Sequence, residues 1–273
     1  MAKMKAGFIG FFDRNQDPWE QMAQAAKIGY RGSETAGMLL NQGNFDENLA
    51  RLKDMGIEPL TVSTMSGETL ARDGVEPMIE QAHRMGVDKA VMFHGKVYFT
   101  KMNQPASYDD VMREIELLQK SAEKCRQEGI KLAYHNHDPE FRMSFNGLTV
   151  FDMLLAYAPD LWIELDVGWT TYAGYNPVEV LHRIAPRLSA VHFKDFLPGP
   201  DVQVSLWGSK ELYNMPNFCS LGSGALDVHG CLKACSELGI EYAIVEQDFM
   251  HALSPMEALQ VDYLVMKESG LLE

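Results

Sequence analysis

Short apolar runs alternate with longer amphipathic segments along the whole chain. The short runs are mostly continuous, which is typical of parallel strands that are covered on both faces. They predict strands over residues 6–12, 30–35, 57–63, 88–94, 130–135, 161–167, 188–193 and 241–246. The segments between them repeat apolar positions at helical spacing. They predict helices at about 17–28, 45–55, 74–85, 107–128, 149–157, 177–185, 226–238 and 255–268.

Five junctions between a predicted helix and the next strand share the same residue pattern. A glycine ends the helical pattern, and an apolar or aromatic residue opens the strand directly after it. Glycine closes a helix in the left-handed conformation without a steric clash. The junction glycines are Gly29, Gly56, Gly86, Gly129 and Gly239. Helix starts are also marked, because Pro follows Asp17, Asn176 and Ser254 and so stands at a first helical position.

Eight strands that alternate with eight helices predict an α/β fold, a single (β/α)8 TIM barrel with right-handed crossovers. An open doubly wound sheet is the alternative, but even repeats without a break in composition favour closure. No linker is visible, so we expect one domain over residues 1–273. Residues 195–225 form the longest irregular stretch, where we expect a lid or substrate loop.

Composition narrows the classes of partner. Of 273 residues, 46% are hydrophobic and 23% charged, and the formal net charge is −14. This acidity disfavours nucleic acid and anionic membranes as partners. The chain has no signal-peptide pattern and no apolar run near the roughly 20 residues of a membrane span, so we expect a cytoplasmic protein. The four cysteines are expected to be reduced, buried thiols.

Ionisable side chains gather at the carboxyl ends of the predicted strands. These ends meet at the face of a TIM barrel where active sites lie. The residues are Asp13, Glu34, His94, His135, His137, Asp138, Glu140, Glu164, Asp166, His192, Lys194, Asp195, Glu246 and Asp248. Alone, a strand-end Asp usually caps a helix, and a His is usually a hydrogen-bonded core residue. Together they would be electrostatically costly without a cation or bound substrate, so the set predicts a metal site.

Three carboxylates and one imidazole make a hard, oxygen-rich ligand set. Such a set suits Mn2+ best, with Mg2+, Co2+ or Zn2+ as alternatives. Two adjacent oxygens of a sugar-like substrate could chelate the ion, which would polarise the carbonyl and stabilise an enediolate. A flanking carboxylate would then remove and return the carbon-bound proton.

Four motifs at strand ends, in order along the chain, carry a family resemblance. They are residues 132–141, 164–169, 191–195 and 244–248. They resemble the xylose isomerase-like barrels, the sugar phosphate isomerases/epimerases. The resemblance spans most of the chain. It implies a divalent metal held by a Glu, Asp, His, Glu set from strands five to eight, and a homo-oligomer, since relatives commonly form dimers or tetramers.

Carried over from the family, Asp166, His192 and Glu246 match three of the metal ligands. At strand five, many sugar epimerases have Glu where this chain has His135. We take Glu140 as the fourth ligand, with His135 as the alternative. Because two metal-bound glutamates exchange the proton in the epimerases, the resemblance assigns catalysis to Glu140 and Glu246.

Other side chains complete the predicted site. His137 and Lys194 share the inward strand face with His135 and His192, and are candidates for proton transfer or substrate contact. The expected substrate-binding residues are Glu34, His94, His135, Trp169 and Asp195. Trp169 either stacks on a sugar face or lies in the core.

A glycine-rich segment at 221–227 resembles a family loop that could cradle a phosphate at a helix N-terminus. A flexible turn is the alternative. No Arg/Lys cluster demands a phosphate, so we expect a neutral sugar, a cyclitol or a keto-glycoside.

Several functions remain open. The first is isomerisation or epimerisation of a keto sugar. The second is a lyase or dehydratase that uses the same chemistry on a keto-cyclitol or 3-keto-glycoside. A sugar-binding barrel without turnover is a third, disfavoured by the intact Asp166, His192 and Glu246. An endonuclease of the same superfold needs a multi-zinc His cluster and a basic groove, which the charge of −14 disfavours.

Overall fold

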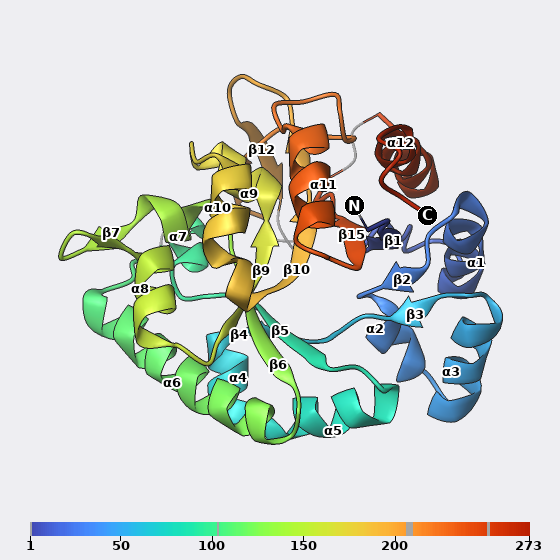
Figure 1. Cartoon of the computed structure of the whole chain (residues 1–273). Coiled ribbons are helices and arrows are strands. Elements are labelled where there is room, and N and C mark those ends of the chain that lie inside the picture. The colour runs from blue at the N-terminus through green and yellow to red at the C-terminus, as the bar shows by residue number, and fades with distance from the viewer. Residues whose placement is uncertain (1, 103, 206–209, 250–251) are drawn as a thin grey trace.

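The computed structural model describes residues 2–102, 104–205, 210–249 and 252–273. Its centre is one curled sheet of parallel strands with helices around it (Figure 1). The strand order in the sheet is β3-β2-β1-β15-β10-β9-β6-β5-β4. Their bounds are β1 Lys5–Phe8, β2 Gly32–Ser33, β3 Glu58–Pro59, β4 Val62–Ser66, β5 Lys89–His94, β6 Lys131–His135, β9 Trp162–Asp166, β10 Leu188–Phe193 and β15 Tyr242–Val245.

The third strand of the barrel is split into β3 and β4. The first half, β3, pairs with β2, and the second half, β4, pairs with β5. Only Leu60 and Thr61 lie between the halves, so the continuous chain closes the sheet into a barrel. Leu60 packs inside the barrel against Ala190, Tyr242 and Ile244, at the end opposite the strand carboxyl termini. The closed TIM barrel predicted from the sequence is thereby confirmed.

Eight helices surround the sheet, each within two residues of a predicted bound. They are α1 Pro18–Ile28, α3 Phe45–Asp54, α5 Glu76–Met85, α6 Tyr108–Gln127, α8 Val150–Tyr157, α10 Pro177–Ile184, α11 Val228–Glu237 and α12 Pro255–Glu268. The junction glycines all have positive φ, for example 74° at Gly86 and Gly129. Asp17 and Asn176 cap α1 and α10 with their side chains, as the Pro positions predict.

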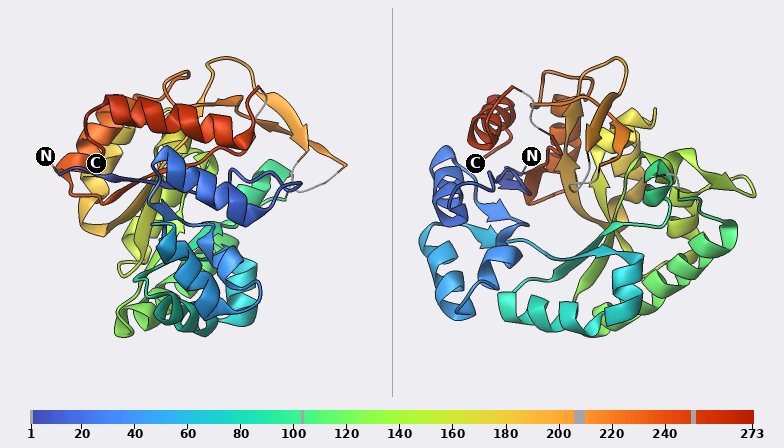
Figure 2. Two further views of the ribbon diagram at one scale, coloured as in Figure 1. Left: turned by 90° about the vertical axis from the view of Figure 1, so that its right-hand side faces the viewer. Right: turned by 180° about the vertical axis from the view of Figure 1, so that it is seen from behind.

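Short elements that the sequence patterns did not predict decorate the carboxyl ends of the strands. They are the helices α2 Ala36–Leu40, α4 Gly67–Asp73, α7 Asp138–Arg142 and α9 Val167–Tyr172, the 3-10 turn Tyr98–Met102, and the paired strands β7 Ser144–Phe145 with β8 Leu148–Thr149, β11 Asp195–Phe196 with β14 Phe218–Cys219, and β12 Val202–Ser205 with β13 Leu212–Met215. A further 3-10 turn, Ala185–Arg187, joins α10 to the start of β10. Both chain termini lie at the other end of the barrel (Figure 2).

The predicted loop over 195–225 is therefore a structured excursion, of which 206–209 lie outside the described residues. Phe196, Met215 and Phe218 pack with Trp169 into a small apolar cluster that fastens the excursion to α9. Ser205 and Met215 line the central cavity, so the loop forms part of its wall. Among the described helices, none is long and apolar enough to cross a membrane.

Candidate metal centre

A cavity of about 720 Å3 opens at the carboxyl ends of the barrel strands. Its lining comes from nearly every strand and the loop that follows it, as is usual for the active face of this fold. Glu34, His94, His135, His137 and Glu246 are among the lining residues. The cavity therefore brings together ionisable side chains that are far apart in the sequence.

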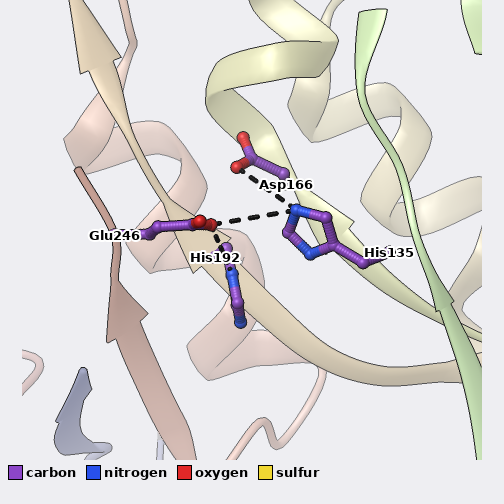
Figure 3. Close-up of side chains that lie close together, drawn as sticks. All are labelled: His135, Asp166, His192 and Glu246. Carbon is purple, nitrogen blue, oxygen red and sulfur yellow. Dashed lines mark hydrogen bonds and ion pairs between the residues drawn. The ribbon is translucent and has the colours of Figure 1, made fainter. Parts of the chain in front are cut away.

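Four of the buried or half-buried ionisable side chains converge at the cavity. His135 ends β6, Asp166 ends β9, His192 lies in β10, and Glu246 follows β15 directly (Figure 3). One potential ligand atom from each lies within 4.8 Å of the others. His192 Nδ1 is 2.8 Å from Glu246 Oε2, and His135 Nε2 is 3.8 Å from the same oxygen.

The sequence around Asp166 explains how its carboxylate is aimed. Oδ1 accepts the backbone N–H of Trp169 at 2.7 Å and caps α9. The amide side chain of Asn136 accepts the backbone N–H of Asp166 at 3.0 Å, which ties the end of β9 to the end of β6. With Oδ1 held by the cap, Oδ2 faces the cluster.

Two atoms of this cluster are buried without a hydrogen-bond partner among the described residues, His135 Nε2 and Asp166 Oδ2. They lie 3.9 Å from each other. Buried polar atoms are nearly always satisfied, so an unsatisfied acceptor pair facing one point needs an explanation. A divalent cation between imidazole nitrogens and carboxylate oxygens supplies one, and the donor set fits it.

A second pair of carboxylates lies on the other side of the two histidines. Glu164 Oε1 is 3.1 Å from His135 Nδ1 and 3.3 Å from His192 Nε2. Glu34 Oε2 is 2.9 Å from His192 Nε2. Glu164 belongs to the strand-end carboxylates expected from the sequence but was given no role there, although its spacing of two from Asp166 on one strand puts both on the same face.

Lys194 is fully buried beside the cluster. Its Nζ is 3.0 Å from Asp248 Oδ2, 3.2 Å from Glu246 Oε1 and 3.5 Å from Asp166 Oδ2. Burial lowers the pKa of Lys194, but these three carboxylates raise it more, so the ammonium stays charged. The lysine therefore holds a positive charge against two of the four converging side chains.

Burial and neighbouring charges shift the pKa values of the cluster in different directions. Burial raises the pKa of Asp166 to about 7, although Lys194 opposes the shift. Burial, with a smaller contribution from His192, lowers the pKa of His135 well below its usual value. For His192, burial lowers the pKa, but Glu164 and Glu34 raise it more. For Glu246, burial raises the pKa, but Lys194 and His192 lower it more.

Glu140, taken from the sequence as the fourth ligand, lies outside this cluster. It is fully buried in α7, where Oε2 accepts the backbone N–H of His137 at 2.9 Å. Oε1 accepts the hydroxyl of Tyr134 at 2.6 Å. Burial raises the pKa of Glu140 to about 7. The member of the cluster that comes from strand five is His135 instead.

Some of the other predicted site residues line the cavity, and others do not. His94 and His137 line the cavity with their rings stacked at 5.3 Å, and burial lowers the pKa of His94 to about 4. Trp169 and Asp195 are not among the described lining residues. Trp169 instead backs the site, with its ring 5.4 Å from that of His137 and 5.3 Å from Lys194 Nζ.

Asp195 organises the glycine-rich loop. Its carboxylate accepts the backbone N–H groups of Gly222, Gly224 and Leu226, each at 3.0 Å, and that of Phe196 at 2.9 Å. The backbone donors that could cradle a phosphate here are thus already bonded to a carboxylate of the same chain.

Comparison with known proteins identifies the family to which the sequence is similar. Residues 22–264 match the family model of the xylose isomerase-like TIM barrel. The inosose dehydratase of Geobacillus kaustophilus is 36% identical over 80 residues, which are 29% of this chain and 25% of that protein. The inosose dehydratase of Clostridium beijerinckii is 25% identical over 201 residues, 70% of this chain and 63% of that protein. In both, the match covers less than two thirds of the relative's length.

A solved structure supports the fold. The sugar phosphate isomerase/epimerase from Parabacteroides distasonis superposes with a TM-score of 0.73 at 16% identity, covering 99% of this chain and 100% of that one. At this identity the likeness concerns the fold.

Proposed function

Because the chain belongs to the xylose isomerase-like TIM barrel family, we propose that it is a divalent-metal-dependent isomerase or epimerase of a keto sugar or sugar derivative. The observation that carries the proposal is the convergence of His135, Asp166, His192 and Glu246, of which His135 and Glu246 line the cavity. Two buried atoms without a hydrogen-bond partner among the described residues, His135 Nε2 and Asp166 Oδ2, face each other there and support a bound ion.

His135 is the proposed strand-five ligand, in place of Glu140. Both oxygens of Glu140 are occupied by Tyr134 and the backbone of α7, whereas Nε2 of His135 has no hydrogen-bond partner among the described residues. Two imidazoles and two carboxylates form a softer set than three carboxylates and one imidazole. This set favours Zn2+, Co2+ or Mn2+ over Mg2+.

The proposed chemistry is proton transfer at a carbon next to a carbonyl. A divalent ion at this site would polarise the carbonyl and stabilise the negative charge that develops on its oxygen. Glu246 is the proposed proton acceptor, since its carboxylate lines the cavity and Lys194 with His192 keeps it ionised. His137 is the proposed partner in proton transfer, because it lines the cavity from the loop after β6, three strands away from β15.

The substrate is proposed to be neutral. Arg14 is the one Lys or Arg among the described residues that line the cavity, and Asp195 fills the glycine-rich loop that could otherwise bind a phosphate. A keto sugar, a keto-cyclitol or a keto-glycoside meets these limits, because each offers adjacent oxygens without a fixed charge.

A dehydratase or lyase is the second candidate. It is favoured by the two relatives described above, which are both named inosose dehydratase. The first step would be the same proton abstraction, after which a hydroxyl on the neighbouring carbon leaves as water. The same acid and base serve either outcome, so the substrate decides between them.

The test is to incubate metal-loaded protein with keto sugars, keto-cyclitols and 3-keto-glycosides in heavy water. Deuterium incorporated at carbon, with an otherwise unchanged molecular formula, identifies an isomerase or epimerase. Loss of water or of the glycosidic partner identifies a lyase. The Asp166→Ala variant is the control and should be inactive. Ligand-induced stabilisation without any exchange or turnover across the panel would contradict an enzymatic role.

A further inference from the structure

One buried carboxylate faces both histidines of the cluster. Glu164 projects into the barrel from β9, and its side chain is 2% exposed. A single oxygen, Oε1, lies 3.1 Å from His135 Nδ1 and 3.3 Å from His192 Nε2. The two imidazole rings are 4.7 Å apart, so one carboxylate reaches both.

The ring nitrogens that face Glu164 are not the ones that face the cluster. His135 turns Nε2 toward Asp166 and Glu246, at 3.9 and 3.8 Å. His192 turns Nδ1 toward Glu246, at 2.8 Å. A neutral imidazole carries one N–H, and the nitrogen that binds a metal must be bare. Metal binding therefore requires the proton on Nδ1 of His135 and on Nε2 of His192, which are the two nitrogens beside Glu164.

We propose that Glu164 and Glu34 are positioning residues that fix the tautomer and orientation of the two histidine ligands, Glu164 at His135 and Glu34 at His192. The inference rests on the metal site proposed above. A carboxyl oxygen that accepts the Nδ1–H of His135 leaves Nε2 of that ring as the bare nitrogen. At His192, Glu34 Oε2 is the hydrogen-bond partner of Nε2 at 2.9 Å, and Glu164 Oε1 lies 3.3 Å from the same nitrogen. Outer carboxylates that accept the N–H of a ligand histidine strengthen metal binding, and their loss typically weakens affinity roughly 10–100-fold.

A second ion between Glu34, Glu164 and His192 is the competing explanation, because their atoms also lie within 4.8 Å. It would require both nitrogens of His192 to be bare while the first ion is bound, which makes the ring an anion. It would also remove the acceptor of the His135 Nδ1–H bond. Hydrogen bonding needs neither change, so the geometry points to one ion with Glu164 behind it.

Histidine 15N NMR of the zinc-loaded wild-type protein tests the tautomers without any variant. The expected result is Nδ1–H with metal-bound Nε2 at His135, and Nε2–H with metal-bound Nδ1 at His192. The opposite tautomer at either residue would overturn the proposal.

Calorimetric titration with Zn2+ tests the energetic role. Glu164→Gln keeps the shape of the side chain but removes its charge and one acceptor oxygen, so it should bind roughly 10–100-fold more weakly with one site retained. The matched variant Glu34→Gln, which alters the partner of His192, should weaken binding by a similar factor. Unchanged affinity in Glu164→Gln, or two sites in the wild type and one in the variant, would overturn the proposal.

These results also separate this inference from the proposed function. A wild type that binds zinc with the tautomers reversed refutes the role of Glu164 and leaves the enzyme proposal intact. A wild type that binds no divalent ion refutes both.

Discussion

The two oxygens of Asp166 face different partners. Oδ1 caps α9 through the N–H of Trp169, and Oδ2 faces His135 and Lys194 without a hydrogen bond. The common structural role of a strand-end aspartate and the functional role coexist in one side chain. The cap contributes to the site by fixing the rotamer that points Oδ2 at the cluster.

Substitutions at the end of β6 distinguish the two candidate ligands there. His135→Ala should weaken binding of Zn2+ or Co2+ by more than the roughly 10–100-fold loss typical of outer-shell partners, because a direct ligand is removed. Glu140→Gln should keep affinity within a few fold. Calorimetric titration measures both. The reverse order of losses would return the ligand assignment to Glu140.

Sequence reasoning at this scale reached Asp166, His192 and Glu246 because each stands at a strand end in a motif. It favoured Glu140 over His135 because the short turn into α7 could not be seen in the pattern. That turn starts at Asp138 and directs Glu140 back to Tyr134. Glu164 was counted among the strand-end carboxylates but given no role, because its contacts with His135 and His192 join strands that are far apart in the sequence.

The glycine-rich loop before α11 depends on one side chain. Asp195→Ala would leave four buried or half-buried N–H groups without their acceptor, at about 1–3 kcal/mol for each one that water cannot reach. We expect the free energy of unfolding in urea to fall by at least about 3 kcal/mol. Asp227→Ala, which removes the cap of the same helix, should cost about 1 kcal/mol. Equal losses would contradict the central role of Asp195.

Helix α12 carries a buried acid that should make stability depend on pH. Asp262 is 2% exposed, its Oδ1 accepts the N–H of Leu221 at 2.8 Å, and burial raises its pKa to about 7. Since this lies above the usual aspartate pKa of 3.8, the folded state keeps the proton to a higher pH than the unfolded state does. The contribution of Asp262 is fully present below 3.8 and is lost as pH rises through about 7.

Asp262→Asn keeps an acceptor for Leu221 without the charge. Relative to wild type, the free energy of unfolding of the variant should therefore rise by about 2–4 kcal/mol between pH 4 and pH 8. Denaturant titrations across this range measure the difference. A gain that is the same at every pH would show that the pKa of Asp262 is not raised in the folded protein.

The long helices, which have recurring start and end residues, could be predicted from the sequence. The short helices could not. The glycine junctions and the Asp17, Asn176 and Ser254 starts located the eight long helices. Strand three was predicted over 57–63 as one piece, but its halves pair with different neighbours. Helices such as α7 and α9 have five and six residues, too few for a periodic pattern. The strand-end Asp166 caps α9, and Glu140 within α7 accepts the backbone N–H of His137.

The four cluster residues come from one half of the barrel, and much of the cavity wall comes from the other half. The cluster residues come from β6, β9, β10 and the end of β15, which are adjacent in the sheet. The opposite strands supply cavity wall, including Met38, Ser63 and His94. One half of the barrel therefore holds the proposed ion, and the other half shapes the space for the substrate.

An ion bound by four adjacent strands should stabilise the folded protein as a whole. At a free concentration 100 times the dissociation constant, it should add about 2.7 kcal/mol to the free energy of unfolding. The thermal midpoint should rise with Zn2+ or Mn2+ and fall back with a chelator. Asp166→Ala should show no such rise, and a shift of equal size in that variant would assign the effect to another site.

The most direct test of the account is anomalous diffraction from crystals grown with Zn2+, recorded at the zinc absorption edge. The account predicts one strong peak about 2.0–2.2 Å from His135 Nε2, Asp166 Oδ2, His192 Nδ1 and a Glu246 oxygen. The absence of a peak among these four side chains, or a peak that includes Glu140 and excludes His135, would contradict it.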